Sequence, residues 1–164
     1  AGFGRTGTFF AYQKYKINPH VVTMAKGMGN GFPIGGILVC PEIEASFGLL
    51  GTTFGGNHLA CQASIAVLDV LEKERLQEKT KSLEMYFKTK AAQIPQIKKV
   101  KGRGLMLGIE FDFEVSELRK KLIYEYHIFT GGSSNKNLIR ILPPLTVQEH
   151  HFDSFFKALE KALK

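Results

Sequence analysis

Cysteine is scarce in this chain: Cys40 and Cys61 are the only two among 164 residues. They form no CxxC pair, and the sequence shows no metal-ligand cluster that combines them with the five histidines. We therefore expect two buried free thiols in a reducing cytoplasm and no metal site.

Long apolar runs and targeting signals are also missing. No apolar stretch approaches the length of a membrane span, and no signal-peptide pattern opens the chain. The composition, 44% hydrophobic and 23% charged, is that of a globular protein. Because the chain starts at Ala1 inside a glycine-rich stretch, with no initiator methionine and no preceding strand, we expect it to be part of a longer protein.

Positive charge exceeds negative charge, and the net charge is +7. The densest basic patch consists of Lys98, Lys99, Lys101 and Arg103. A nucleic-acid-binding module would surround such a patch with aromatic residues or a known motif, and neither is present. The patch is therefore interpreted as a solvated face, or as a source of mild attraction for anionic substrates.

The first part of the chain alternates short apolar runs with glycine-rich turns and helical patterns. We expect buried strands at 21–25 and 34–40, and a helix over 58–73 that is apolar nearly all round and hence buried. Asn57 stands where it can cap that helix. The next helix carries its apolar stripe on Leu76, Leu83, Phe87, Ala91 and Ile94, and ends before Pro95.

The composition shifts at 95–103, which predicts a domain boundary there. Beyond it we expect strands at 104–111 and 138–142, a helix over 116–126, and a last helix with Phe152, Phe155, Phe156, Leu159 and Leu163 on one face. The predicted fold class is α/β, with an α/β first domain (1–98) followed by a small α+β domain (99–164).

Two nucleotide-binding patterns are excluded. The segment GFGRTG at 2–7 matches GxGxxG, but no strand precedes it and no acidic residue occurs before Glu42, so the dinucleotide-binding context is missing. Lys26 precedes Gly27 and does not fit the GxxxxGK[ST] spacing of a phosphate-binding loop.

Lys26 lies where an apolar strand meets a glycine-rich turn, in the segment TMAKGMGNG at 23–31. A lysine that forms a Schiff base needs low polarity, which depresses its pKa, and a rigid element that aims its nitrogen. The alternative is a surface lysine in a turn, and spacing alone leaves both readings open.

Two further segments could bind anions. The loop GTTFGGN at 51–57 offers hydroxyls and backbone N–H groups just before a helix, which suits a phosphate, although a simple capped loop explains it as well. Arg140 stands in an otherwise apolar strand, where it needs a carboxylate partner. That partner could be structural or a substrate.

Taken in order, several segments resemble the class III (ornithine-type) aminotransferases of fold type I. They are GFGRTG at 2–7, TMAKGMGNGFPIGG at 23–36, TTFGGNHLAC at 52–61, KGRGLMLGIE at 101–110 and RILPPL at 140–145. The resemblance implies that residues 1–98 form the second half of the cofactor domain and residues 99–164 the C-terminal small domain. Within the class, the segments are most similar to enzymes that act on N-acetylornithine or N-succinylornithine in arginine biosynthesis.

The resemblance also implies roles for individual residues. Lys26 would bind pyridoxal 5′-phosphate covalently and later move a proton between substrate and cofactor. Thr53 would bind the cofactor phosphate across the interface of a cytoplasmic homodimer. Thr52, where the family usually has serine, would contact the acylated substrate, and Arg140 would hold its α-carboxylate. The amino acceptor would be 2-oxoglutarate, and neither nucleic acid nor membrane is an expected partner.

The resemblance shows what the sequence does not contain. The family places an aspartate upstream of the segment that matches residues 1–7, where it holds the pyridine nitrogen of the cofactor. With no acid before Glu42, we expect weak or no transamination from this chain alone. Two alternative interpretations stay open. The chain could belong to an ornithine or 4-aminobutyrate aminotransferase of the same class, or it could be a non-catalytic fragment that binds no cofactor.

Overall fold

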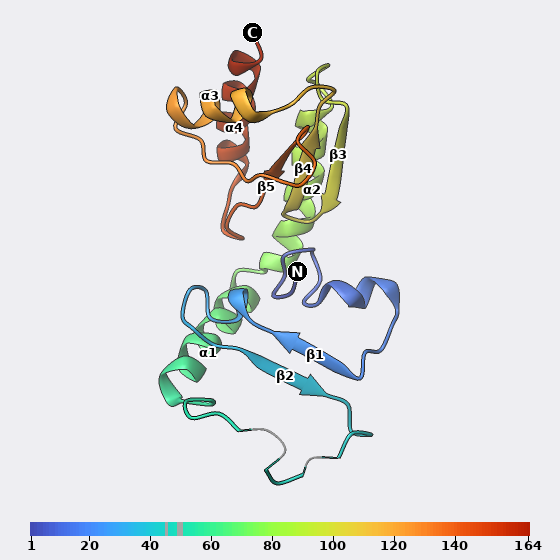
Figure 1. The fold of residues 1–164 in the computed structure, drawn as a ribbon, viewed down its shortest axis with the longest axis vertical. Coiled ribbons are helices and arrows are strands. Elements are labelled where there is room, and N and C mark those ends of the chain that lie inside the picture. Colours follow the sequence, from blue (N-terminus) through green and yellow to red (C-terminus); the bar gives the residue numbers. More distant parts are fainter. Residues whose placement is uncertain (45, 49–50) are drawn as a thin grey trace.

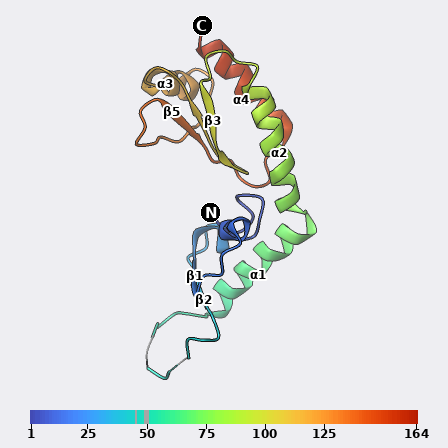
Figure 2. The ribbon, with the colours of Figure 1, turned by 90° about the vertical axis from the view of Figure 1, so that its right-hand side faces the viewer.

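The computed structural model describes residues 1–44, 46–48 and 51–164, which form two lobes joined end to end (Figure 1). We call residues 1–73 the N-terminal lobe and residues 76–164 the C-terminal lobe. Helices α1 and α2 follow one another along one side of the molecule and connect the lobes (Figure 2). None of the described helices combines the length and apolar character that a membrane crossing needs.

The N-terminal lobe has little regular structure besides one long helix. Its elements are the 3-10 helix η1 (Ala11–Tyr15), strand β1 (Val21–Met24), the 3-10 helix η2 (Lys26–Met28), strand β2 (Gly36–Val39) and helix α1 (His58–Lys73). The two strands pair antiparallel, with Val21 opposite Val39 and Met24 opposite Gly36. A small core of Phe3, Leu71 and Leu76 lies where α1 meets the N-terminal segment and the start of α2.

The bounds predicted for α1 are confirmed, whereas the burial predicted for this lobe is wrong. Only Ala60, Ser64 and Leu71 of α1 are buried, and Leu59 is 68% exposed. Strands β1 and β2 contain no buried residue. An apolar pattern shows that a surface is able to pack, but burial also requires a neighbour, and the described residues supply one for only part of this surface.

The C-terminal lobe contains the larger core. Its elements are α2 (Leu76–Ala91), β3 (Lys99–Arg103), β4 (Met106–Glu110), α3 (Ser116–Tyr124), β5 (Leu138–Ile141) and α4 (Glu149–Ala162). The strands form an antiparallel sheet in the order β3-β4-β5. Helices α2 and α4 lie side by side against it (Figure 2). The predicted α+β character of this region is therefore confirmed.

Sequence periodicity predicted the faces of these helices correctly. The whole stripe from Leu76 to Ile94 is buried, as are Leu118 and Leu122 of α3 and four of the five residues expected on the inner face of α4. Leu163 is only partly buried. The larger core takes in α2 from Leu83 onward, so this core already begins before residue 98. The division into domains at residue 98 stays a prediction.

Strand β3 was missed by sequence analysis, which treated 99–103 as a basic patch at a boundary. Only Val100 of this strand is partly buried, and the other four residues are exposed. β3 is the edge of its sheet, and charged side chains on an edge strand discourage pairing with another chain. Such a strand carries no apolar alternation that would identify it from sequence.

Candidate functional site

Lys26 follows the end of β1 and begins η2. Its backbone is left-handed, with a φ of 55°, and its side chain is exposed. Within residues 1–44, 46–48 and 51–164, no carboxylate forms an ion pair with its ammonium group. The predicted position at a strand end is correct, but the predicted apolar surroundings are not formed by the described residues. The amine is therefore open to a ligand.

Thr52 and Thr53 lie in the loop before α1, and both are exposed. Asn57 caps the helix as predicted: its side-chain oxygen accepts a hydrogen bond from the Ala60 N–H at 2.9 Å. Its amide nitrogen donates to the Phe54 carbonyl, also at 2.9 Å. The cap therefore fixes the end of the loop, while the two hydroxyls stay accessible.

Arg140 lies on the exposed face of β5, between the buried residues Ile139 and Ile141. The expected carboxylate partner is not found among the described residues, because the strand alternates and leaves the guanidinium on its open face. The Arg140 N–H donates to the Gly131 carbonyl at 3.0 Å, and the Gly131 N–H donates to the Arg140 carbonyl at 2.9 Å. A Cβ at Gly131 would lie 2.7 Å from the Arg140 Nε, so glycine leaves room for this side chain.

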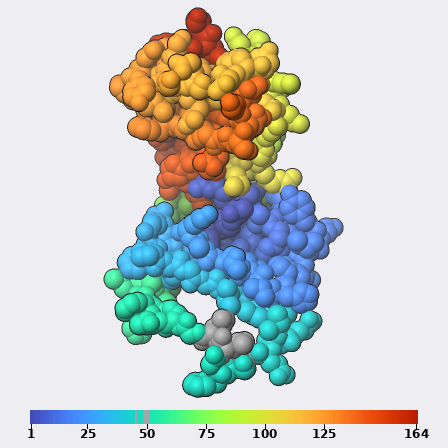
Figure 3. Space-filling view, viewed as in Figure 1, coloured from blue at the N-terminus to red at the C-terminus, as the bar shows by residue number. Residues whose placement is uncertain are grey.

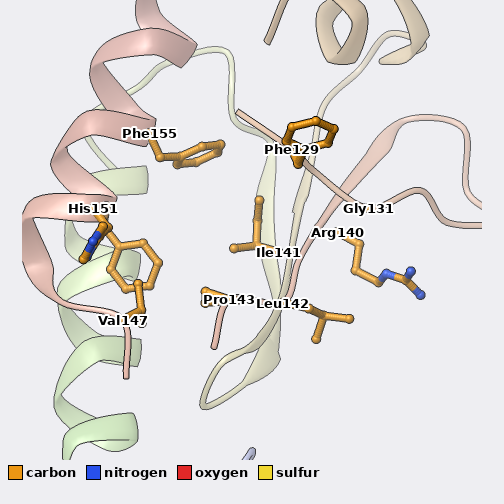
Figure 4. Close-up of a pocket in the computed structure, with 10 residues that line it drawn as sticks. Phe129, Gly131, Arg140, Ile141, Leu142, Pro143, Val147, His151 and Phe155 are labelled. Atoms are coloured by element: carbon orange, nitrogen blue, oxygen red, sulfur yellow. The ribbon is translucent and has the colours of Figure 1, made fainter. Parts of the chain in front are cut away.

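A cavity of about 360 Å³ opens beside Arg140. Phe155 points toward it from α4, His151 of the same helix also lines it, and the Arg140 side chain extends on the other side, away from that helix (Figure 4). Its lining is Phe129, Gly131, Arg140, Ile141, Leu142, Pro143, Val147, His151, Phe152 and Phe155. A carboxylate with an apolar extension would match an arginine beside such a wall.

The predicted site residues belong to separate elements. Lys26 begins η2, Thr52 and Thr53 belong to the loop before α1, and Arg140 lies on β5 of the C-terminal lobe. The lining of the cavity beside Arg140 includes none of the other three.

Arg5 connects the two lobes, a role that was not predicted, because GFGRTG was read as a glycine pattern and as part of the family resemblance without any task for its arginine. Its Nη1 donates hydrogen bonds to the carbonyl oxygens of Leu105 and Pro143, at 3.3 Å and 2.5 Å. Its own carbonyl accepts from the Leu105 N–H at 2.9 Å. Burial lowers the pKa of Arg5 from its ordinary value. The N-terminal segment, dark blue in Figure 3, accordingly lies at the contact between the lobes.

Gly104 completes this contact. Its φ is +57°, and a Cβ on it would lie 2.5 Å from the Arg5 carbonyl oxygen and 2.7 Å from the Thr6 Cα. Its N–H donates to Glu84 on α2. Burial alone would raise the pKa of Glu84, but hydrogen bonds from Lys88 and from the Gly104 N–H outweigh it and hold that pKa below its ordinary value. Gly104 thus allows a close approach that a side chain would block.

Gly104→Ala is expected to lower the free energy of unfolding by about 1–3 kcal/mol, since the new methyl group meets backbone atoms that cannot move independently. Urea denaturation of the purified protein measures this. Gly56→Ala is the matched control, because Gly56 also has positive φ (+70°) but has nothing within 4 Å of its Cβ position. Equal losses in the two variants would show that the contact with Arg5 and Thr6 contributes nothing.

Three side chains that could bind a metal lie together, although no sequence motif joins them. They are His20, Cys40 and Glu42, beside the β1–β2 pair. The pairing of the strands brings together residues 20 positions apart, which spacing rules for metal motifs do not detect. The expectation of no metal site stays a prediction, and both free thiols, Cys40 and Cys61, are only partly buried rather than fully buried as expected.

Comparison with known proteins agrees with the expected family. The model of the family "Aminotransferase class-III" matches residues 1–163. An acetylornithine aminotransferase of Aquifex aeolicus (strain VF5) is 42% identical over 164 residues, which is 99% of this chain and 42% of that protein. One from Methanocaldococcus jannaschii is 37% identical over 98% of this chain and 41% of that protein. The chain thus spans about two fifths of the length of these relatives.

Solved structures agree with the fold. An ornithine aminotransferase from Toxoplasma gondii ME49 superposes with a TM-score of 0.86 at 26% identity, over 99% of this chain and 41% of that one. An acetylornithine aminotransferase from Elizabethkingia anophelis gives 0.81 at 27% identity, over 98% of this chain and 43% of that one. The predicted fold class, part of a larger transferase domain with mixed helices and sheets, is confirmed.

Proposed function

Since the chain belongs to the class III aminotransferases, we propose that it forms part of a pyridoxal-phosphate-dependent enzyme of the acetylornithine type. The whole protein would move the δ-amino group of N-acetylornithine or N-succinylornithine to 2-oxoglutarate, which gives the semialdehyde and glutamate. The observation that carries this proposal is Lys26, an accessible amine at the end of a paired strand, in a chain that matches the family over residues 1–163.

The chain fits part of a pyridoxal-phosphate site. Lys26 offers an unpaired amine among the described residues, and Thr53 offers an accessible hydroxyl for the phosphate. No aspartate or glutamate occurs in residues 1–41, so an acid that could hold the pyridine nitrogen near Lys26 has to come from elsewhere in the whole protein. When bound, the cofactor would draw electrons from the substrate carbon that carries the amine.

Lys26 would have two tasks: to hold the cofactor through its amine, and then to carry a proton between substrate and cofactor. The pairing of β1 with β2 supports both tasks, because it fixes the backbone two residues before Lys26. The glycine turn that follows leaves the side chain uncrowded. A side chain that carries a proton needs a backbone held in place and an amine free to move, and this arrangement provides both.

Arg140 would bind the α-carboxylate of the substrate through paired N–H groups. Its exposed guanidinium beside the cavity of about 360 Å³ supports this role, as does the room that Gly131 leaves for it. Thr52 would contact the acyl group. The carboxylate sets the orientation of the substrate, and the cavity wall would accept its apolar part.

Thr53 would act in the site of a second copy of the chain, across a homodimer interface. Two observations support this: the loop before α1 is exposed, and it lies at the end of the lobe away from Arg140 (Figure 1). A role in arginine biosynthesis in the cytoplasm follows from the same proposal and rests on the similarity to acetylornithine aminotransferases.

The competing substrate is free ornithine, which the names of two similar solved structures, both of ornithine aminotransferases, favour. Turnover of acetylornithine, succinylornithine, ornithine and 4-aminobutyrate by the whole protein, with 2-oxoglutarate as acceptor, distinguishes the two. We expect kcat/KM to be highest for an acylated ornithine, because a pocket built to hydrogen-bond a polar group rejects analogues that lack it. A marked preference for free ornithine would contradict the proposed substrate.

A further inference from the structure

A histidine, a cysteine and a glutamate meet at the end of the β1–β2 pair opposite Lys26. Ligand atoms of His20, Cys40 and Glu42 all lie within 4.8 Å of one another. Within the part of the chain that the structure describes, this is the one group of three or more His, Cys, Asp or Glu side chains with such closeness. We propose that these three residues bind a zinc ion that joins the ends of the two strands.

The backbone places two of the ligands directly opposite each other. The ladder of β1 and β2 pairs Val21 with Val39, and the Cys40 N–H donates to the His20 carbonyl at 2.8 Å. His20 and Cys40 therefore continue the same register by one residue. Opposed residues in an antiparallel pair point to the same face, with Cβ atoms roughly 5 Å apart. This spacing lets both side chains reach one ion.

A tight turn brings the third ligand back. The Ile43 N–H donates to the Cys40 carbonyl at 3.1 Å, which closes a turn with Pro41 at its second position, where the fixed φ of proline is favourable. Glu42 then points toward β1, and its Oε2 lies 3.6 Å from the His20 Nε2. Two zinc ligands at about 2.1 Å in tetrahedral geometry are separated by about 3.4 Å. This pair is thus already close to that separation.

The mixture of donors favours zinc. Imidazole nitrogen, thiolate sulfur and carboxylate oxygen are all zinc ligands, whereas Ca²⁺ and Mg²⁺ prefer oxygen alone. The His20 and Glu42 side chains are 71% and 80% exposed, so an ion can enter from solvent and water can complete the fourth position. Cys40 would release its thiol proton on binding. At about 3.3 Å per residue, the site is roughly 20 Å along the chain from Lys26, so the ion would hold the strand ends rather than take part in transfer.

Titration of the purified whole protein with Zn²⁺, and with Co²⁺ as a spectroscopic probe, tests the proposal without any need for pyridoxal phosphate or activity. We expect one ion per chain, and a thiolate-to-cobalt absorption band. Cys40→Ser and His20→Gln should each weaken Zn²⁺ binding at least about 10-fold, since even changes to outer partners of a metal site cost 10–100-fold. Cys40→Ser should also abolish the band.

Cys61→Ser and His150→Gln are the matched controls, because they remove the other cysteine and a histidine of the adjacent His150–His151 pair. Both should bind Zn²⁺ like the unchanged protein. Zn²⁺ should also raise the thermal unfolding midpoint of the unchanged protein but not that of Cys40→Ser. Unaltered Zn²⁺ binding in Cys40→Ser and His20→Gln, or loss of the thiolate-to-cobalt band in Cys61→Ser, would overturn the proposed site. Failure of the proposed transamination would leave these readouts unaffected.

Discussion

Replacing Lys26 by glutamine is expected to lower transamination by the whole protein at least about 10³-fold, because the variant loses both covalent attachment of the cofactor and the base that carries the proton. Glutamine keeps the Cβ and most of the side-chain length, so the left-handed backbone at φ 55° meets no new strain. The measurement is kcat with the preferred acylornithine and 2-oxoglutarate under saturating pyridoxal phosphate.

Lys16→Gln is the control for charge and backbone. Lys16 is also exposed, and its φ is 53°, yet it lies outside the strand–turn junction. Its replacement should leave kcat within about twofold, as expected for a surface position. Borohydride reduction with pyridoxal phosphate, followed by peptide mapping, should label Lys26 in the unchanged protein. A label on another lysine, or none in the whole protein, would contradict the enzymatic proposal and favour a non-catalytic role.

Replacing Phe87 by alanine is expected to lower the free energy of unfolding by about 3–5 kcal/mol, the usual cost of emptying a buried aromatic site. Phe87 is 0% exposed and lies at the centre of an aromatic group between α2 and α4. Its ring centroid is 5.1 Å from that of Phe152 and 4.9 Å from that of Phe156. Few of these rings can shift to refill the space, because all of them are already buried in the same close-packed core.

Met85→Ala on the same helix is the control, since Met85 is 66% exposed and should change stability by less than about 0.5 kcal/mol. The chain has no tryptophan, so far-ultraviolet circular dichroism in a urea titration is the suitable probe. A loss below about 1 kcal/mol for Phe87→Ala would show that the aromatic group does not stabilise the C-terminal lobe. Phe152 and Phe155 also line the cavity beside Arg140. Phe87→Ala should therefore also raise the KM of the whole protein for its acylornithine substrate, because the aromatic side chains beside the cavity would be less well held.

Local sequence patterns predicted the regular elements well where one face is apolar and the other charged. Helix α2 shows this directly, because the stripe from Leu76 to Ile94 is buried as its 3.6-residue period requires. The same reasoning failed for α1 and for β1 and β2. Their residues are apolar on several sides, and such a pattern shows that a surface can be buried without showing what covers it.

Candidate site residues were predictable only where a single segment carries the signal. Lys26 stands at a strand end followed by glycines, and the family pattern selects it among the 22 basic residues. Arg140 was singled out because it interrupts an apolar strand, but its exposed position could not be predicted, since the alternation of β5 depends on which face meets α2 and α4.

The sequence by itself determined the family and the buried faces of α2, α3 and α4, and it singled out Lys26 as a candidate, because each of these depends on residues close together in the chain. Only the tertiary structure decided which distant residues meet. It placed Gly104 against Arg5, and it set His20 opposite Cys40 through the register of the β1–β2 pair. Such contacts follow from register and packing between elements, which residue type and local spacing do not specify.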